Sequence, residues 1–387
     1  MRMPADLASD TLRPFRIEIP DADLAALRER IRHTRWPADV PESSPDYGVP
    51  LSRVREFADH WASRYDWRAH ERRLNEWPQF KTSLDGDDVH FIHARSREPD
   101  ALPLVVTLGY PSSPAELLPI LGPLVDPGAH GGDPRDAFHV VAPSIPGYGF
   151  SGPPCNGKWD ARRIATAWDT LMKRLGYARF GAQGSDWGAV IAPEIGRVAM
   201  SRVIGIHVNA LVLMPPTDPK AFEGLSAREL QRLEGQKRYM SQHLGYAQLQ
   251  STRPQTLAYA LTDSPVGQLA WSLDLCDAFS RREPGQTAID RDMILTSVAI
   301  HWFTGTAGSS ARLYRDAGEH AFNPSQNSGV PTGVAVFAGD SAIRRFAERA
   351  NTIVHWSEFD TGGHLASVQA PRLLVDDIRT FFRTLRG

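Results

Sequence analysis

The sequence predicts an α/β fold: a mostly parallel, doubly wound sheet with an inserted helical lid and a helical N-terminal meander. Continuous apolar runs such as Leu102 to Leu108 are typical of strands buried on both faces of a parallel sheet, and helix-like segments alternate with these runs. A long helical stretch, residues 215–329, interrupts the alternation before strand-like runs resume. Ahead of the alternation, residues 1–85 are mainly helical and rich in aromatic side chains.

Composition narrows the class of protein. The chain has 387 residues, a net charge of −2, 42% hydrophobic and 23% charged residues, which is typical of a globular protein without a basic surface for nucleic acid. The 13 histidines follow no metal-site spacing, and the 2 cysteines imply no disulfide framework. The N-terminus has no apolar signal segment, and no run approaches the roughly 20 apolar residues of a membrane span. We expect a cytoplasmic protein without cofactor, metal, nucleic-acid or membrane partner. The sequence does not decide whether the protein forms a homodimer.

The N-terminal segment, residues 1–85, is expected to wrap on the core as a meander. Asp21 and Ser52 each precede apolar residues at helical spacing and are expected to cap two helices. Four tryptophans are too many for a solvated tail: Trp36, Trp61, Trp67 and Trp77. The segment therefore has a structural role.

The core is expected in two parts, residues 86–214 and residues 330–387. In the first, Asp160 is expected to cap an amphipathic helix that Gly176 ends. The strand-like runs after the opening hairpin are 102–108, 138–142, a short run from residue 180 that leads into the turn at residues 184–188, 203–213, 333–337 and 353–359, and the last helix spans 373–382. The excursion 215–329 stands where a lid would cover a site, although a separate inserted domain is the alternative.

The stretch Gly184-Ser185-Asp186-Trp187-Gly188 has the spacing of a nucleophile elbow, a sharp turn from a strand into a helix. Serine is the usual nucleophile in this turn, but here it is Asp186. A carboxylate needs no base to deprotonate it and can attack an electrophilic carbon directly to form an ester. This chemistry suits carbon–oxygen or carbon–halogen bonds. By itself, such a string is as consistent with a plain Gly-Asp turn.

An ester on Asp186 needs a base that activates water, and His364 follows the last strand on a Gly-Gly loop. A carboxylate is expected to orient this histidine, and Asp340 follows the preceding strand. The order nucleophile, acid, histidine is that of α/β-hydrolases. Glu358 and Asp360 are the fallback acids.

An oxyanion hole is expected from the backbone N–H groups of Trp187 and Tyr110. A substrate oxygen that leaves carbon also needs an acid, and a neutral tyrosine phenol suits that role. The predicted lid offers four: Tyr239, Tyr246, Tyr259 and Tyr314. Spacing alone does not choose among them.

Nearly end to end, the chain resembles epoxide hydrolases of the microsomal and juvenile-hormone type, which have the α/β-hydrolase fold and an N-terminal extension. The matching stretches are Thr34-Arg-Trp-Pro37, Pro143 to Ser151, Gly184 to Gly188, Asp263 to Gly267, Gly305-Thr306 with Ser309 to Tyr314, Pro331 to Val334 and Gly362 to His364. The resemblance implies Asp186 as nucleophile, Asp340 and His364 as the water-activating pair, and Tyr246 and Tyr314 as lid acids. It also implies a soluble bacterial form that acts on an epoxide and water, in detoxification or natural-product biosynthesis, and the aromatic lid favours a bulky or aryl epoxide.

Two positions depart from the family pattern. Leu108 precedes Gly109-Tyr110-Pro111 where the family has histidine, and Ser185 stands in the elbow where glycine is usual. Both changes bear on activity and not on fold. The alternatives to an epoxide hydrolase are a haloalkane or haloacid dehalogenase, which shares the Asp nucleophile, and a catalytically weak hydrolase-fold binding protein.

Overall fold

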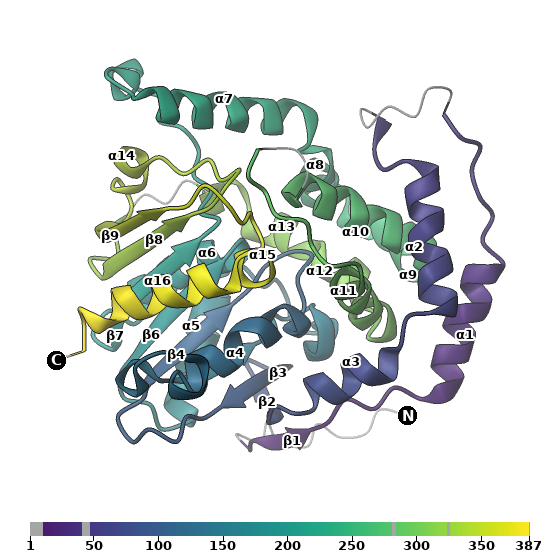
Figure 1. The fold of residues 1–387 in the computed structure, drawn as a ribbon, viewed down its shortest axis with the longest axis horizontal. Helices are drawn as coiled ribbons and strands as arrows, with labels where there is room; N and C mark the ends of the chain where they lie inside the picture. The colour runs from purple at the N-terminus through teal and green to yellow at the C-terminus, as the bar shows by residue number, and fades with distance from the viewer. Residues whose placement is uncertain (1–10, 41–46, 281–283, 323–325, 387) are drawn as a thin grey trace.

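The computed structural model describes residues 11–40, 47–280, 284–322 and 326–386. Within these residues nine strands form one sheet in the order β1-β2-β3-β5-β4-β6-β7-β8-β9 (Figure 1). The strands are β1 Arg13–Phe15, β2 Gln79–Leu84, β3 Asp87–Ala94, β4 Leu102–Thr107, β5 Phe138–Pro143, β6 Phe180–Ser185, β7 Val203–Asn209, β8 Pro331–Val336 and β9 Thr352–Glu358.

The sheet is parallel from β5 to β9 and antiparallel only where β1, β2 and β3 join it. The predicted fold class, a mostly parallel sheet, is confirmed. Parallel strands end at the same edge, so the residues that follow β6, β8 and β9 come together there. The register pairs Ser185 at the end of β6 with Asn209 at the end of β7.

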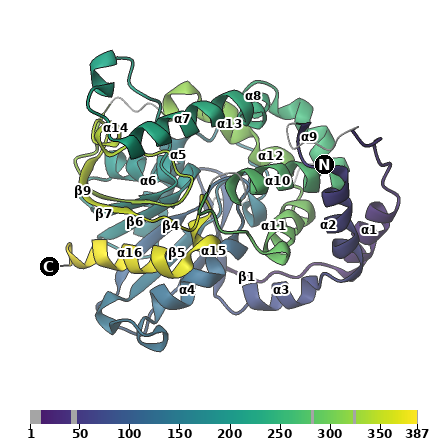
Figure 2. The ribbon, with the colours of Figure 1, turned by 45° about the horizontal axis from the view of Figure 1, so that its top comes forward.

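Both faces of the sheet are covered by helices, which explains the continuous apolar strands. Figure 2 shows α4 and α16 on one side of the strands and α5 and α6 on the other. Along β4, Leu104 and Val106 pack into the cluster that contains α4 and α16, while Val105 between them packs into the opposite cluster. These helices are α4 Leu118–Val125, α5 Ala161–Arg174, α6 Trp187–Val198 and α16 Pro371–Arg383.

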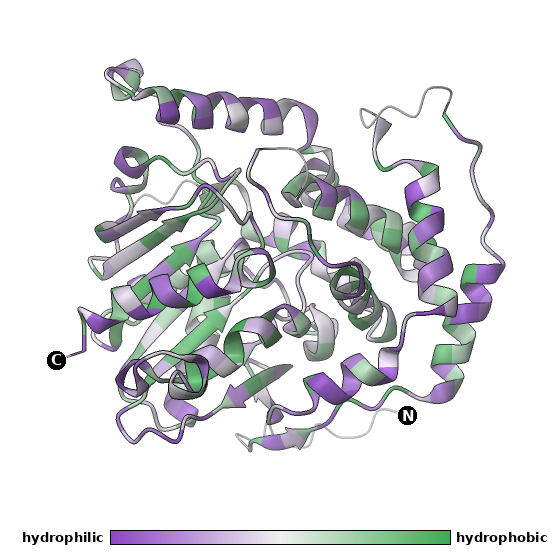
Figure 3. Cartoon of the chain, in the orientation of Figure 1, coloured by the Kyte–Doolittle hydropathy of each residue, from purple (hydrophilic) through white to green (hydrophobic). Residues whose placement is uncertain are grey.

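Helices α7 to α13 lie between β7 and β8 in the chain, within residues 215–329. They are α7 Ala227–Gln242, α8 Gly245–Thr252, α9 Pro254–Asp263, α10 Pro265–Ser280, α11 Arg291–Phe303, α12 Ala307–Ser310 and α13 Arg312–Ala317. Figure 3 shows α7 as mainly hydrophilic, in contrast to the strands of the sheet. Its buried Leu233 packs with Ile343 and Phe346, so a narrow apolar contact holds α7 against the part of the core that follows β8.

The N-terminal helices are α1 Asp21–Arg32, α2 Leu51–Ser63 and α3 Trp67–Leu74. Leu27 and Trp61 share a buried cluster with Leu269 of α10 and Ile300 of α11. An ion pair between Arg53 and Asp277 of α10, at 2.6 Å, joins the same elements. The extension therefore packs against the helices between β7 and β8, and its strand β1 adds to the edge of the sheet.

Some boundaries differ from the expectations. Asp160 caps α5 by accepting from the N–H of Arg163, as predicted, but the caps predicted at Asp21 and Ser52 are wrong. Pro20 and Pro50 take those positions, and the fixed φ of proline suits the entry to a helix. The strand predicted to reach residue 213 ends at residue 209, because the chain turns at residue 210 with φ +52°. Among the described residues, no helix is long and apolar enough to cross a membrane.

Candidate active site

Asp186 stands on a sharp turn between β6 and α6. Its φ is +56° and its ψ is −120°, a conformation that L-residues rarely adopt. The flanking glycines permit this turn: a Cβ at Gly184 would lie 1.9 Å from the carbonyl oxygen of Gly188, and a Cβ at Gly188 would lie 1.9 Å from that of Thr107. The geometry is that of a nucleophile elbow, and the residue at the tip of the turn carries a carboxylate.

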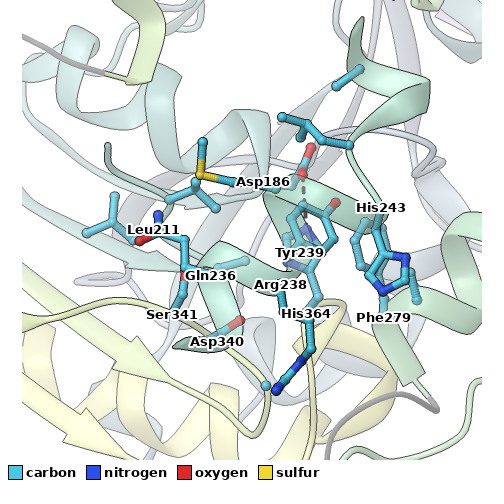
Figure 4. A pocket seen from close by; sticks show the side chains of 18 of the residues that line it. Asp186, Leu211, Gln236, Arg238, Tyr239, His243, Phe279, Asp340, Ser341 and His364 are labelled. Carbon is cyan, nitrogen blue, oxygen red and sulfur yellow. Dashed lines mark hydrogen bonds and ion pairs between the residues drawn. The ribbon is translucent and has the colours of Figure 1, made fainter. Parts of the chain in front are cut away.

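Two groups hold the Asp186 carboxylate. The N–H of Tyr110 donates to Oδ1 at 2.8 Å, and Nε2 of His364 lies 3.0 Å from Oδ2 (Figure 4). Gly109 allows this approach, because a Cβ there would lie 1.9 Å from Oδ1. Leu108 thus replaces the family's histidine without removing the Tyr110 donor from the carboxylate.

His364 comes from the loop after β9 and stacks on Phe279 of α10, with ring centroids 4.1 Å apart and planes at 21°. Burial lowers the pKa of His364, but the hydrogen bond and charge of Asp186, together with the charges of Asp340 and Glu116, raise this pKa above its ordinary value. The Asp186 carboxylate therefore stabilises the protonated form of the imidazole in the resting site.

Asp340 is half-buried on the loop after β8. Its Oδ2 accepts from the N–H of Phe337 at 2.9 Å. Burial raises the pKa of Asp340, while His364 and the Phe337 N–H oppose the rise. The charge of Asp340 in turn raises the pKa of His364, although no hydrogen bond joins the two side chains among those of the described residues. The structure thus places Asp340 within electrostatic reach of His364.

The fallback acids Glu358 and Asp360 face the helix α7 instead. Arg232 donates to Glu358 at 2.8 Å, and Arg228 pairs with both carboxylates. The hydrogen bond from Arg232 is the main cause that lowers the pKa of Glu358. Both carboxylates, one at the end of β9 and one in the loop after it, are therefore engaged in ion pairs with α7.

Two of the four candidate tyrosines face Asp186. Tyr246 on α8 and Tyr314 on α13 lie edge to face, with ring centroids 5.8 Å apart, and Tyr314 also packs on Trp187 at 4.9 Å. Burial raises the pKa of both phenols well above 10, and the charge of Asp186 adds to this. Both therefore stay neutral hydrogen-bond donors at neutral pH.

The other two tyrosines differ from each other. Tyr259 is 72% exposed and lies outside the cavity. Tyr239 lines the cavity, and its hydroxyl lies 3.1 Å from that of Tyr246. The structure thus separates four candidates that spacing alone leaves equivalent.

The N–H of Trp187, the first residue of α6, adjoins Asp186. Among the hydrogen bonds of the described residues none uses this donor, while Tyr110 already donates to Oδ1. Ser185, the second departure from the family pattern, lies beneath the turn, where its hydroxyl accepts from Asn209 at 2.9 Å. The serine therefore joins a buried polar contact that ties β6 to β7.

A cavity of about 1550 Å³ opens over the Asp186 carboxylate. Asp340, His364, Tyr246 and Tyr314 line it as well. Its remaining walls come from the loop after β7, from α7, α8 and the end of α10, from residues 284–286 and from the loops after β8 and β9. Within the described residues no group of three or more His, Cys, Asp or Glu side chains is arranged to hold a metal ion.

Sequence reasoning did not single out Phe279 or Glu116. Phe279 reaches His364 from α10, 85 residues away in the chain, and no local signal marks such a contact. Glu116 is 4% exposed beneath the Tyr110 loop. The sequence feature that could have singled out Glu116 is a charged residue close to Pro111 in an otherwise apolar segment.

A largely parallel sheet, an elbow that carries a carboxylate and a histidine on the loop after the last strand define a hydrolase of the α/β-hydrolase class. Comparison with known proteins identifies the family. A sequence model described as "Epoxide hydrolase N terminus" matches residues 12–117. Epoxide hydrolase 1 of Sus scrofa is 30% identical over 412 residues, covering 99% of this chain and 91% of its own length.

A protein of Stigmatella aurantiaca (strain DW4/3-1), provisionally named as an epoxide hydrolase, is 39% identical over 378 residues, 97% of this chain and 85% of its own. The solved epoxide hydrolase of Aspergillus niger superposes with a TM-score of 0.87 at 29% identity, covering 98% of this chain and 97% of that one. The juvenile hormone epoxide hydrolase of Bombyx mori does so with a TM-score of 0.89 at 26% identity, covering 98% and 96%. The chain belongs to the epoxide hydrolase family and is an enzyme of that class.

Proposed function

We propose that this epoxide hydrolase forms an ester on Asp186 and hydrolyses it with a water molecule activated by His364. The observation that supports this most directly is the Asp186 carboxylate itself, which faces the cavity between the Tyr110 N–H and His364. Tyr246 and Tyr314 line the same cavity and interact electrostatically with Asp186. Nucleophile, base and acids thus converge on one space that admits a substrate.

In the first step, an oxygen of Asp186 attacks one epoxide carbon. The carbon–oxygen bond of the ring breaks, its electron pair stays on the epoxide oxygen, and a phenol of Tyr246 or Tyr314 donates a proton to that oxygen. The product is a hydroxyalkyl ester of Asp186. The phenols suit this step because their raised pKa keeps them protonated until the alkoxide forms.

In the second step, His364 takes a proton from water, and the resulting hydroxide attacks the ester carbonyl. The N–H groups of Tyr110 and Trp187 stabilise the tetrahedral oxyanion, and its collapse releases a vicinal diol. Ester formation removes the Asp186 charge, a main cause of the raised pKa of His364. The pKa of His364 therefore falls when the ester is present, which favours the neutral imidazole that can act as a base.

The cavity favours a bulky or aryl epoxide. Its volume of about 1550 Å³ exceeds that of most small-molecule sites, roughly 300 to 1,000 Å³. Aromatic and aliphatic side chains such as Phe279, Leu211 and Met214 line it. A large apolar substituent on the epoxide would fill this space better than a small aliphatic group would.

The test is the intact mass of a His364→Gln variant after exposure to styrene oxide. We expect a gain of one whole epoxide, localised by peptide mapping to Asp186, because this variant alkylates but lacks the base. A double variant that adds Asp186→Asn should gain nothing. An adduct on another peptide, or none across a panel of aryl epoxides with the protein folded, would contradict the proposal. Halide release from alkyl halides would instead indicate a dehalogenase.

A further inference from the structure

Tyr239 lies in the last turn of α7, and Tyr246 is the second residue of α8. The turn between the two helices folds the chain back, so that the two hydroxyl oxygens lie 3.1 Å apart although the residues are seven positions apart in the chain. The Tyr239 ring also contacts His243, the C-cap of α7, with centroids 6.1 Å apart. Tyr239 is half-buried and lines the cavity, next to one of the two proposed lid acids (Figure 4).

A phenol hydroxyl has one proton and can accept hydrogen bonds on the same oxygen. In the substrate-free site either hydroxyl can be the donor of the Tyr239–Tyr246 hydrogen bond. When an epoxide occupies the cavity, the proton of Tyr246 points at the epoxide oxygen. Toward Tyr239, the Tyr246 oxygen can then only accept, so Tyr239 must be the donor.

We propose that Tyr239 is a positioning and proton-supplying residue for epoxide opening: its hydroxyl donates to Tyr246 while Tyr246 donates to the epoxide oxygen. This inference rests on the proposed role of Tyr246 as a lid acid. Hydrogen bonds in such a chain strengthen one another, and a donor to Tyr246 stabilises the negative charge that develops on its oxygen.

The protons balance across the cycle. Ring opening leaves an electron pair on the epoxide oxygen, which takes the Tyr246 proton; Tyr246 takes the Tyr239 proton, and Tyr239 takes one from water in the cavity. That cavity water is left as hydroxide, and the one proton that His364 removes from the attacking water over the cycle neutralises it. The net reaction is addition of one water molecule to the epoxide, and both phenols are regenerated.

A purely structural role for Tyr239 is the alternative, because its ring packs the end of α7. Tyr239→Phe keeps the ring and removes only the hydroxyl. Tyr259→Phe is the matched control, since Tyr259 is a lid tyrosine that is 72% exposed and lies outside the cavity. Each change is placed in the His364→Gln background, where rapid quenching and intact mass give the rate of adduct formation from styrene oxide.

We expect Tyr239→Phe to slow adduct formation roughly 3- to 10-fold, the value of one neutral hydrogen bond, and Tyr259→Phe to leave it unchanged. The deciding measurement is the double variant with Tyr246→Phe. If Tyr239 acts through Tyr246, its substitution has no further effect once the Tyr246 hydroxyl is absent. In the His364-intact enzyme, Tyr239→Phe should leave the rate of ester hydrolysis unchanged.

Other outcomes separate this inference from the proposed function. Adduct formation that is slowed by Tyr246→Phe but not by Tyr239→Phe would overturn the role of Tyr239 alone. Equal slowing by Tyr239→Phe with and without the Tyr246 hydroxyl, or equal slowing of both chemical steps, would indicate a structural role and also overturn it. If Tyr246→Phe had no effect, the lid-acid assignment would fail together with this inference. No adduct on Asp186 in any variant would refute the proposed site itself.

Discussion

Glu116 provides a stability prediction whose size follows from the structure. It lies in the 3-10 turn Pro114–Leu117 and is 4% exposed. Ser297 donates to its Oε1 at 3.2 Å, while Oε2 has no hydrogen-bond partner among the described residues. Burial raises the pKa of Glu116 from 4.5 to about 7, against hydrogen bonds from nearby serines that lower it.

The sign follows from proton binding in the two states. The folded protein holds the Glu116 proton up to about pH 7, whereas the unfolded chain releases it near pH 4.5. Between these values the folded state binds more protons, so stability falls as the pH rises. A pKa raised from 4.5 to about 7 corresponds to a decrease of about 3 kcal/mol in the free energy of unfolding across this window. Below the window, the neutral carboxyl carries no such penalty.

Glu116→Gln removes the charge at every pH while keeping the size of the side chain. Its free energy of unfolding, relative to the parent enzyme, should therefore rise by about 3 kcal/mol between pH 4.5 and pH 8.5. Urea denaturation followed by tryptophan fluorescence measures this difference. Glu98→Gln is the control, because Glu98 is exposed and should show a flat difference. A pH-independent difference for Glu116→Gln would refute the argument that burial holds this carboxyl neutral.

Three further predictions concern charge and hydrogen bonding. Asp377 is 6% exposed. Its hydrogen bonds with His207 and a second histidine outweigh burial and hold its pKa below the ordinary value. The stability that this carboxylate contributes to the fold is therefore present above about pH 4. Asp377→Asn should lower the free energy of unfolding by about 2 kcal/mol at both pH 7 and pH 9 in urea denaturation, and a loss confined to one pH would contradict this. The kinetic pKa of ester hydrolysis, from single-turnover rates against pH, should lie below the pKa of His364 in the free enzyme by NMR, since the ester removes the Asp186 charge; an equal or higher value would be inconsistent. Leu108→His should change the rate of adduct formation by less than roughly tenfold, because the loop N–H already lies 2.8 Å from the carboxylate, and a hundredfold gain would count against that reasoning.

Local sequence is sufficient to predict the sheet and the turns that carry the site. Strands buried on both faces must be apolar throughout, so runs such as 102–108 predict the parallel core directly. The glycines around Asp186 and the Gly-Gly pair before His364 mark turns that their neighbours in the chain dictate. Parallel strands end at one edge, so the order of these residues in the chain already predicts that they meet, and the structure places their side chains 3.0 Å apart.

Contacts between elements that are distant in the chain depend on the tertiary structure. Spacing alone does not choose among the four lid tyrosines. In the structure, the packing of α7, α8 and α13 over the sheet places Tyr246 and Tyr314 within electrostatic reach of Asp186 and leaves Tyr259 exposed. The same holds for Phe279 against His364. Such contacts depend on how helices dock, which is set by the summed packing of many side chains and not by the period of any one helix.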